Sequence, residues 1–337
     1  MLKNLKNVSY SLLDLSPILE GGTPSDSLRN TLDLAQHAEN WGYTRYWLAE
    51  HHNMPGIASS ATSVIIGHVA AGTSTIRVGS GGVMLPNHAP LVIAEQFGTL
   101  ESLFPGRIDL GLGRAPGTDQ LTAHALRRNG RMDAEDFPEQ LAELCAYFDP
   151  VKAAGKVHVR AIPGEGLQIP IWLLGSSGFS AQLAGKLGLP FSFASHFSPE
   201  NTLPALALYR SNFQPSEVLD KPYAMVGINV IAADTNEEAE KLATSMQQQF
   251  LFLIRNRPKP LQPPVENFAA MCSDYEKLLL QQRIGSSIIG DKNTVKEKLQ
   301  AFLEETKADE WMIHSQIYDH EARLYSYKLV SEIMKGA

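Results

Sequence analysis

The sequence has few of the features that mark secreted or membrane proteins. Only two cysteines occur in 337 residues, Cys145 and Cys272, and they lie far apart inside helical patterns. Two isolated thiols are typical of a reducing compartment rather than of a disulfide framework. No apolar run has the length of a membrane span, and residues 1–8 lack the apolar core of a signal peptide. We therefore expect a cytoplasmic protein.

Basic clusters are also missing. The formal net charge is −7 at pH 7, and no stretch of lysines and arginines stands out. A nucleic-acid-binding surface needs a basic patch, so this charge argues against that class of function. The length is ample for a large core, and the composition shows no internal break. We expect a single domain over residues 1–337 that binds neither nucleic acid nor membrane.

Eight predicted strands alternate with predicted helices. The strands are expected at 8–15, 45–49, 76–85, 108–112, 170–174, 191–194, 224–232 and 310–314. Such alternation is typical of parallel strands joined by helical crossovers, and eight strands in one domain favour a closed (β/α)₈ barrel. The alternative is a doubly wound open sheet with a C-terminal helical domain. The missing G-x-G-x-x-G fingerprint after the first strand argues against it.

Two polar excursions interrupt the alternation, near residues 115–136 and 247–282. The first is expected to be a long loop with a short helix, and the second is rich in proline and arginine around 255–264. A small extra strand is predicted at 156–162. Because the loops after barrel strands surround the binding site, we expect both excursions to act as lids over a substrate pocket.

The strand at 108–112 ends in glycines and one arginine. Gly113, Arg114 and Gly117 would place backbone N–H groups and a fixed cation where the sheet ends. Ligands bind at that end of α/β folds, and an arginine can hold a phosphate through two parallel hydrogen bonds. The alternative is an ordinary turn with a surface arginine. Arg114 is therefore a candidate phosphate ligand.

A second turn of small residues, Gly175-Ser176-Ser177-Gly178, separates a predicted strand from a predicted helix. Small residues let several backbone N–H groups meet at a helix N-terminus, where the helix dipole favours an anion. Ser176 and Ser177 add hydroxyl donors, although serines also cap helices without any ligand. The turn is a second candidate phosphate site.

A glycine run, Gly79-Ser80-Gly81-Gly82, lies inside the third predicted strand. Glycine weakens strand pairing, so the run indicates either a bulge or the close approach of a flat ligand.

His51 and His52 end the second predicted strand, directly after Glu50. Adjacent strand residues point to opposite faces, so the two histidines are not expected to bind one metal. A metal site would need ligands from other strand ends, and no spacing connects the available ones. Those candidates are Asp14, His88 and His314. We predict no metal site.

Four motifs stand at the ends of successive predicted strands. They are Leu48-Ala-Glu-His-His-Asn-Met-Pro, Val78-Gly-Ser-Gly-Gly-Val-Met-Leu-Pro-Asn-His-Ala-Pro, Pro105-Gly-Arg-Ile-Asp-Leu-Gly-Leu-Gly-Arg and Leu174-Gly-Ser-Ser. In this order they resemble the bacterial luciferase-like flavin-dependent monooxygenases, and the likeness spans nearly the whole chain. The resemblance implies a (β/α)₈ barrel with insertions that binds FMN, usually as reduced FMN supplied by a separate NAD(P)H-flavin reductase.

The resemblance also implies roles for single residues. The histidine that matches His51 is the family's catalytic histidine, expected here to donate a hydrogen bond or a proton. The segment that matches Gly81-Gly82 carries a non-prolyl cis peptide bond packed against the flavin ring. The expected cofactor-binding residues are Gly81, Gly82, Met84, Arg114, Gly175, Ser176, Ser177 and Gly178.

One departure from the luciferases concerns Gly113. Luciferase α chains carry a reactive cysteine at the matching position, so neither light emission nor an aldehyde substrate is implied. Glycine at this position is expected to leave more room beside the flavin.

The sequence thus predicts an FMN-dependent monooxygenase that uses reduced flavin and O₂ to oxygenate a small organic substrate. The alternatives are a non-catalytic flavin-binding protein, a deazaflavin (F420)-dependent oxidoreductase, and a metal-dependent barrel hydrolase that uses His51, Asp14 and His314.

The family also implies a homodimer that pairs through helices near the second and third strands. Gly67, Ala70 and Ala71 would permit close approach of two such helices.

Overall fold

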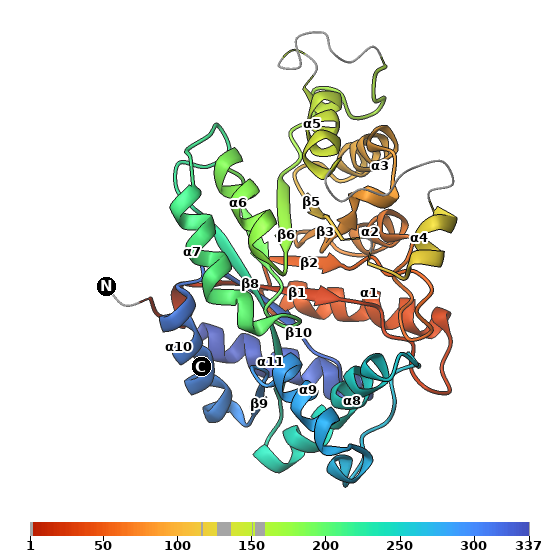
Figure 1. The fold of residues 1–337 in the computed structure, drawn as a ribbon, viewed down its shortest axis with the longest axis vertical. Coiled ribbons are helices and arrows are strands. Elements are labelled where there is room, and N and C mark those ends of the chain that lie inside the picture. Colours follow the sequence, from red (N-terminus) through yellow and green to blue (C-terminus); the bar gives the residue numbers. More distant parts are fainter. Residues whose placement is uncertain (1–2, 116, 127–135, 150, 152–158, 337) are drawn as a thin grey trace.

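The computed structural model describes residues 3–115, 117–126, 136–149, 151 and 159–336, and its main strands form a closed barrel (Figure 1). The barrel strands are β1 (Ser9–Asp14), β2 (Arg45–Leu48), β3 (Arg77–Ser80), β5 (Ile108–Gly113), β6 (Ile171–Gly175), β7 (Phe191–Phe193), β8 (Ala224–Ala232) and β10 (Glu310–His314). Each pairs in parallel with the next, and β8 pairs with β10 to close the ring. The predicted (β/α)₈ barrel is confirmed.

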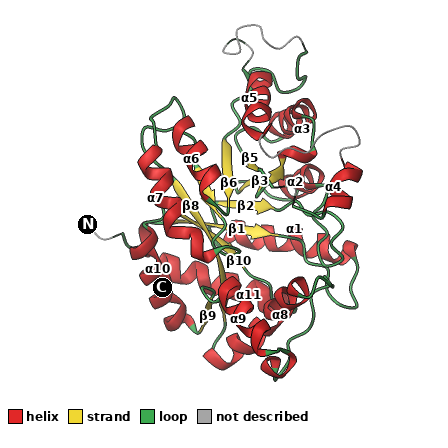
Figure 2. Ribbon diagram, in the orientation of Figure 1, coloured by secondary structure: helices red, strands yellow, loops and turns green. Residues whose placement is uncertain are grey.

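Helices form the outer layer around these strands (Figure 2). They are α1 (Pro24–Asn40), α2 (Thr62–Ala71), α3 (Pro90–Leu103), α4 (Gln120–Leu126), α5 (Phe137–Phe148), α6 (Gly178–Leu187), α7 (Thr202–Asn212), α8 (Asn236–Ile254), α9 (Asp274–Ile284), α10 (Lys292–Thr306) and α11 (His320–Lys335). No helix among the described residues combines the length and apolar character that a membrane span requires.

The strands are buried on both faces, which explains their apolar runs. All nine residues of β8 are buried, as expected for a parallel sheet covered by helices. Helix residues such as Leu34, Ile66 and Phe97 pack against the barrel in one continuous core. The barrel is therefore a filled core, and its ligand sites must lie at its ends.

The third predicted strand, 76–85, is interrupted. β3 ends at Ser80, and β4 (Val83–Met84) resumes beside β5 after Gly81-Gly82. The peptide bond between the two glycines is cis, as the resemblance implied. Of the extra strand predicted at 156–162, residues 156–158 lie outside the described residues, and residues 159–162 form no strand.

A short strand that the sequence did not predict, β9 (Ile288–Gly290), extends the barrel. β8 pairs with β10 up to Asn229 and with β9 from Val230 onward. α8 and α9 pack around Ile231 in a small second core. The expected excursion near 247–282 is therefore partly helical, because α8 continues to Ile254 and α9 begins at Asp274.

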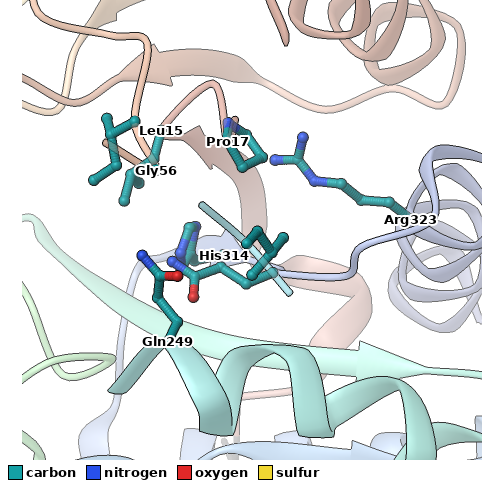
Figure 3. A pocket seen from close by; sticks show the side chains of 9 residues that line it. Leu15, Pro17, Gly56, Gln249, His314 and Arg323 are labelled. Atoms are coloured by element: carbon teal, nitrogen blue, oxygen red, sulfur yellow. The ribbon is translucent and has the colours of Figure 1, made fainter. Parts of the chain in front are cut away.

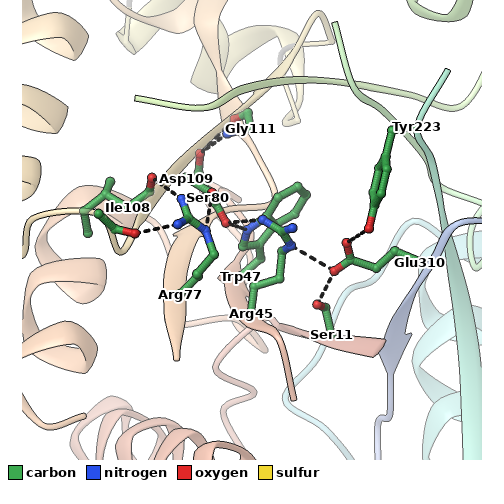
Figure 4. Close-up of polar contacts among 11 residues, drawn as sticks. Ser11, Arg45, Trp47, Arg77, Ser80, Ile108, Asp109, Gly111, Tyr223 and Glu310 are labelled. Carbon is green, nitrogen blue, oxygen red and sulfur yellow. Dashed lines mark hydrogen bonds and ion pairs between the residues drawn. The ribbon is translucent and has the colours of Figure 1, made fainter. Parts of the chain in front are cut away.

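A buried network of charges closes the amino-terminal end of the barrel (Figure 4). Arg45, at the start of β2, lies 2.8 Å from Asp109 Oδ2 through Nη1 and 2.8 Å from Glu310 Oε1 through Nε. Arg77 Nη2 lies 2.6 Å from Asp109 Oδ1, and the Tyr223 hydroxyl donates to Glu310 Oε2 at 2.9 Å. Both carboxylates are fully buried, so each has the charged partners that burial requires.

Candidate active site

The sequence-predicted site residues meet at the carboxyl-terminal mouth of the barrel. His51 follows β2, Gly81-Gly82 follows β3, Arg114 follows β5, and the turn 175–178 joins β6 to α6. These four strands are consecutive in the sheet, so the segments lie along one arc of the mouth. Barrel active sites are built at this end.

Arg114 is a half-buried arginine at the end of β5. Its guanidinium carbon lies 4.1 Å from the centre of the Phe179 ring, in the first turn of α6. No acidic side chain within the described ranges pairs with it. The cation–π contact therefore places the guanidinium beside the helix start and leaves its N–H groups available to a ligand.

The start of α6 offers further donors. Ser177 precedes the helix in an extended conformation, and its hydroxyl makes no capping hydrogen bond. Among the residues that the structure describes, neither Ser176 nor Ser177 has a side-chain hydrogen-bond partner. The first-turn N–H groups thus have no side-chain cap, at the helix end where the dipole favours negative charge. Together with Arg114, this end of α6 suits a phosphate.

The glycine run at the end of β3 is explained by close packing. A Cβ on Gly81 would lie 2.9 Å from Leu13 Cδ1, and a Cβ on Gly82 would lie 2.8 Å from the Gly111 carbonyl oxygen. Neither position has room for a side chain. The protein's own packing therefore requires glycine here, and the run does not by itself indicate a ligand.

Met84 fills the space beside Gly113. A Cβ on Gly113 would lie 2.6 Å from Met84 Sδ. The expectation that Gly113 leaves extra room is therefore wrong, because a thioether from the neighbouring strand takes up that space. Met84 is half-buried, and it is the residue that stands beside the position of the luciferase cysteine.

His51 has its tautomer set by the backbone. Its Nδ1 lies 3.2 Å from the Gly117 carbonyl oxygen, which can only accept a hydrogen bond. The proton therefore sits on Nδ1, and Nε2 is an acceptor when the ring is neutral. Burial lowers the pKa of His51, which favours the neutral ring at pH 7. His51 is thus poised to take up a proton at Nε2, whereas the sequence analysis expected it to donate one.

Two more histidines lie near His51. His314 ends β10 and His196 follows β7, with ring centres 5.7 Å apart. Burial lowers the pKa of His196 to about 3 and that of His314 to about 4, so both rings are neutral at pH 7. The sequence analysis named His314 only as a metal candidate and missed His196. A polar residue just past the end of a predicted strand was the available signal.

The Glu50 carboxylate connects the end of β2 to the segment around β4 through hydrogen bonds. His52 Nε2 and His88 Nε2 each lie 2.9 Å from Glu50 Oε1, and the Met84 N–H donates to Oε2 at 3.1 Å. Burial acts to raise the pKa of Glu50, but the contacts with His88, His52 and the Met84 N–H lower it overall.

Glu50, His52 and His88 also have their ligand atoms within 4.8 Å of one another, close enough to hold a metal ion. The sequence analysis did not connect these residues, since Glu50 and His52 share one strand end and His88 lies beyond the next. Their spacing is equally that of hydrogen bonds to one shared carboxylate oxygen.

Asp14 does not combine with His51 and His314 as a metal site. Its carboxylate accepts hydrogen bonds from Arg323 at 2.8 Å and from Thr31 at 2.7 Å, and it is fully buried. Asp14 is therefore engaged by protein donors. The hydrolase alternative loses its carboxylate ligand.

Comparison with known proteins places the chain in a family. The family model described as luciferase-like monooxygenase matches residues 10–310. An uncharacterized protein, YvbT, from Bacillus subtilis is 61% identical over 98% of both chains, and a luciferase-like monooxygenase from Escherichia coli K12 is 57% identical over 97% of both. The N-acetyl-S-alkylcysteine monooxygenase of Bacillus subtilis is 35% identical over 98% of this chain and 99% of its own.

Solved structures share the fold over the same length. Apo-MsnO8 superposes with a TM-score of 0.90 at 34% identity, covering 97% of this chain and 98% of its own. The oxygenating constituent of 3,6-diketocamphane monooxygenase, in complex with FMN, superposes with a TM-score of 0.71 at 19% identity, covering 98% of both. The chain belongs to the luciferase-like monooxygenase family.

Proposed function

We propose that this protein is an FMN-dependent monooxygenase that uses reduced FMN and O₂ to oxygenate a small organic substrate. The observation that carries the proposal is the guanidinium of Arg114, which pairs with no acidic side chain in the described part of the chain, beside the start of α6, which has no side-chain cap. A fixed cation and free helix N–H groups fit the terminal phosphate of FMN. Membership of the luciferase-like monooxygenases supports the type of reaction.

FMN would be held at both ends. Arg114 and the turn 175–178 would bind the phosphate through the guanidinium, two hydroxyls and the helix N–H groups. Gly81, Gly82 and Met84 would line the ring system. When bound, the reduced flavin supplies the electrons that activate O₂, since the cofactor carries the difficult chemistry. The protein's own contribution is to orient the ring and keep water from it.

His51 would handle a proton at the mouth of the barrel. Its neutral ring presents an acceptor at Nε2, fixed in direction by the Nδ1 contact with Gly117. We propose that Nε2 takes up a proton from the substrate during oxygen transfer and returns it to the product or to water.

A separate NAD(P)H-flavin reductase would supply the reduced FMN. The proposal rests on the absence of a dinucleotide-binding fingerprint from the sequence. It also rests on the resemblance to the family, which implies that a separate reductase supplies the reduced FMN.

We also propose a homodimer through α2 and α3. Val64 on α2 is 71% exposed and Leu103 on α3 is 64% exposed, on two helices that contact each other. Of the three small residues expected at the interface, Ala71 is exposed, Gly67 is half-buried and Ala70 is buried. A Val64→Glu, Leu103→Glu variant should sediment as a monomer. A wild-type monomer at micromolar concentration would contradict the pairing.

The test of the activity is a reconstituted reaction under ¹⁸O₂. The mixture holds the protein, FMN, NADH, a general flavin reductase and a panel of organic compounds that begins with N-acetyl-S-alkylcysteines, after the named relative. We expect a product with one ¹⁸O atom that needs both protein and FMN. Oxidation of the panel with F420 and without O₂ would favour the deazaflavin alternative. Flavin binding without any turnover would favour a non-catalytic protein.

A further inference from the structure

A small pocket lies beside the carboxyl-terminal ends of the neighbouring strands β1 and β10 (Figure 3). Leu15, Pro17 and Gly56 face it from one side, and Gln249 and His314 face it from the other. The walls are tied together by backbone hydrogen bonds. The Ile18 N–H donates to the Gly56 carbonyl at 3.0 Å, and the Leu261 N–H donates to the Ile18 carbonyl at 2.8 Å. Three loops far apart in the sequence thus build one fixed enclosure.

Two glutamines in this pocket have unsatisfied amides. Gln249 is 7% exposed, and its Oε1 is buried without a hydrogen-bond partner. Gln316 Oε1 is likewise buried and unpartnered. Within the described part of the chain, no hydrogen bond is made by either side-chain amide. An unpaired buried polar group destabilises a protein, so two of them in one pocket need an explanation.

The pocket carries no uncompensated charge. Its arginine, Arg323, donates to Asp14 Oδ1 at 2.8 Å and to the Ser315 carbonyl at 3.1 Å. His314 donates from Nδ1 to the Leu13 carbonyl at 3.1 Å, which leaves Nε2 as an acceptor on a neutral ring. The polar wall therefore suits neither a free carboxylate nor a sulfonate, because the cation is already paired.

A neutral group with adjacent donor and acceptor atoms would satisfy this wall. A carboxamide, lactam or urea offers N–H and C=O side by side, which matches the donor and acceptor of a glutamine amide. The cavity holds only about 10 Å³, so the polar end of such a group would enter it beside Leu15 and Leu261, and the remainder of the compound would lie in the mouth of the barrel. We propose that the pocket binds a neutral amide-type group of the compound that the enzyme oxygenates, through Gln249 and Gln316. This inference rests on the proposed function only in taking the occupant to be the substrate.

The position of His314 connects the pocket to the chemistry. His314 lines the pocket, and its ring centre is 5.7 Å from that of His196 near His51. An amide anchored by the glutamines would therefore hold the rest of the substrate toward the centre of the mouth. Such anchoring contributes to catalysis by orientation.

The test compares three probes of similar shape: butyramide, N,N-dimethylbutyramide and butyrate. Their dissociation constants are measured by ligand-observed NMR on the FMN-loaded protein, on Gln249→Met and on Gln316→Met. We expect wild-type protein to prefer butyramide by about tenfold over both other probes, the range of one or two hydrogen bonds. Each variant should lose most of that preference. The steric cost of the two methyl groups is the same in all proteins and cancels in the comparison.

Thermal unfolding separates a ligand site from a structural role. Gln249→Met and Gln316→Met should keep or raise the melting temperature, because they remove unpaired polar groups. Gln248→Met is the matched control on α8, since Gln248 Nε2 donates to the Pro263 carbonyl at 2.8 Å and its loss should lower the melting temperature.

Equal binding of the three probes, absence of binding by all of them, or an unchanged preference in both variants would overturn the inference. FMN affinity is measured on each protein as well. A failure of FMN binding would contradict the proposed function, while the probe comparison on the flavin-free protein would still decide the inference.

Discussion

At the scale of single residues, the proposed role of His51 depends on one ring nitrogen, Nε2. Gly117 holds the proton on Nδ1, and burial keeps the pKa below its usual value, so Nε2 is a free base at neutral pH. We predict that His51→Ala lowers kcat by about a hundredfold or more, the range of a general base. FMN affinity should change little. The kcat of the wild type should fall only below pH 6.5, as His51 gains its proton, and this acid limb should vanish in the variant. Steady-state oxygen consumption across pH measures both, and an unchanged acid limb would contradict the role.

Single residues of the site differed in how far the sequence could predict them. Arg114 and Ser176 each stand two residues beyond the end of a predicted strand, and the topology alone brings strand ends together. Gln249 lies on a helix that leaves the barrel, and nothing in its neighbours distinguishes it from Gln248. Its position depends on the packing of α8 against loops far away in the sequence. The contact of Met84 with Gly113 was missed for the same reason, since it joins two strands whose register could not be predicted from the sequence.

At the scale of elements, Glu50 joins β2 to β4. Glutamine has one acceptor oxygen where Glu50 has two, so either the Met84 N–H or the contacts of His52 and His88 lose their acceptor. We predict that Glu50→Gln lowers the free energy of unfolding at pH 7 by about 1–3 kcal/mol, the cost of an unpaired buried donor. Glu240→Gln, an exposed glutamate on α8, is the control and should change nothing.

The same carboxylate contributes to acid stability. The pKa of Glu50 is lower in the folded protein than in the unfolded chain, so its contribution is present above pH 4.5 and is lost as the pH falls through the folded value. Urea unfolding between pH 3 and 7 should therefore show a weaker pH dependence in Glu50→Gln than in the wild type. If the free energy of unfolding depended on pH equally in both proteins, the predicted lowering of the Glu50 pKa would be contradicted.

Element boundaries were predictable where local chemistry sets them. Helix α1 begins directly after Thr23, whose side chain accepts a hydrogen bond from the Asp26 N–H, and Asp26 completes a reciprocal capping box. Strand β9 was missed because three residues carry too little periodicity to be recognised. It forms because β8 extends beyond the barrel, where its residues from Val230 onward pair with β9.

At the scale of the whole molecule, the eight-strand ring depends on the buried charges at its floor, which is the amino-terminal end of the barrel. Arg45 balances Asp109 and Glu310, each fully buried. We predict that Arg45→Ala lowers the free energy of unfolding by about 3–5 kcal/mol, because it removes the arginine that pairs with buried Glu310 and leaves Asp109 with Arg77 alone. Arg160→Ala, which removes an exposed pair with Glu165, should leave the urea midpoint unchanged. Similar midpoints for the two variants would contradict the role of the floor.

The barrel itself was predictable from the count and spacing of strands, since parallel alternation leaves few topologies. The floor network was not, because Arg45, Asp109 and Glu310 are separated by up to 265 residues in the sequence. Only the closure of the ring brings them together. The small second core around Ile231 lies beyond the ring, where β8 pairs with β9.

The central claim is that Arg114 and the start of α6 form the phosphate site of a flavin. The direct measurement is an anaerobic titration of wild type and Arg114→Ala with reduced FMN and with reduced riboflavin, which lacks the phosphate. We predict that wild type prefers reduced FMN by about 10–100-fold, as a charge-assisted contact would give, and that the variant loses this preference. Equal affinity of wild type for both flavins, or an undiminished preference in the variant, would contradict the account.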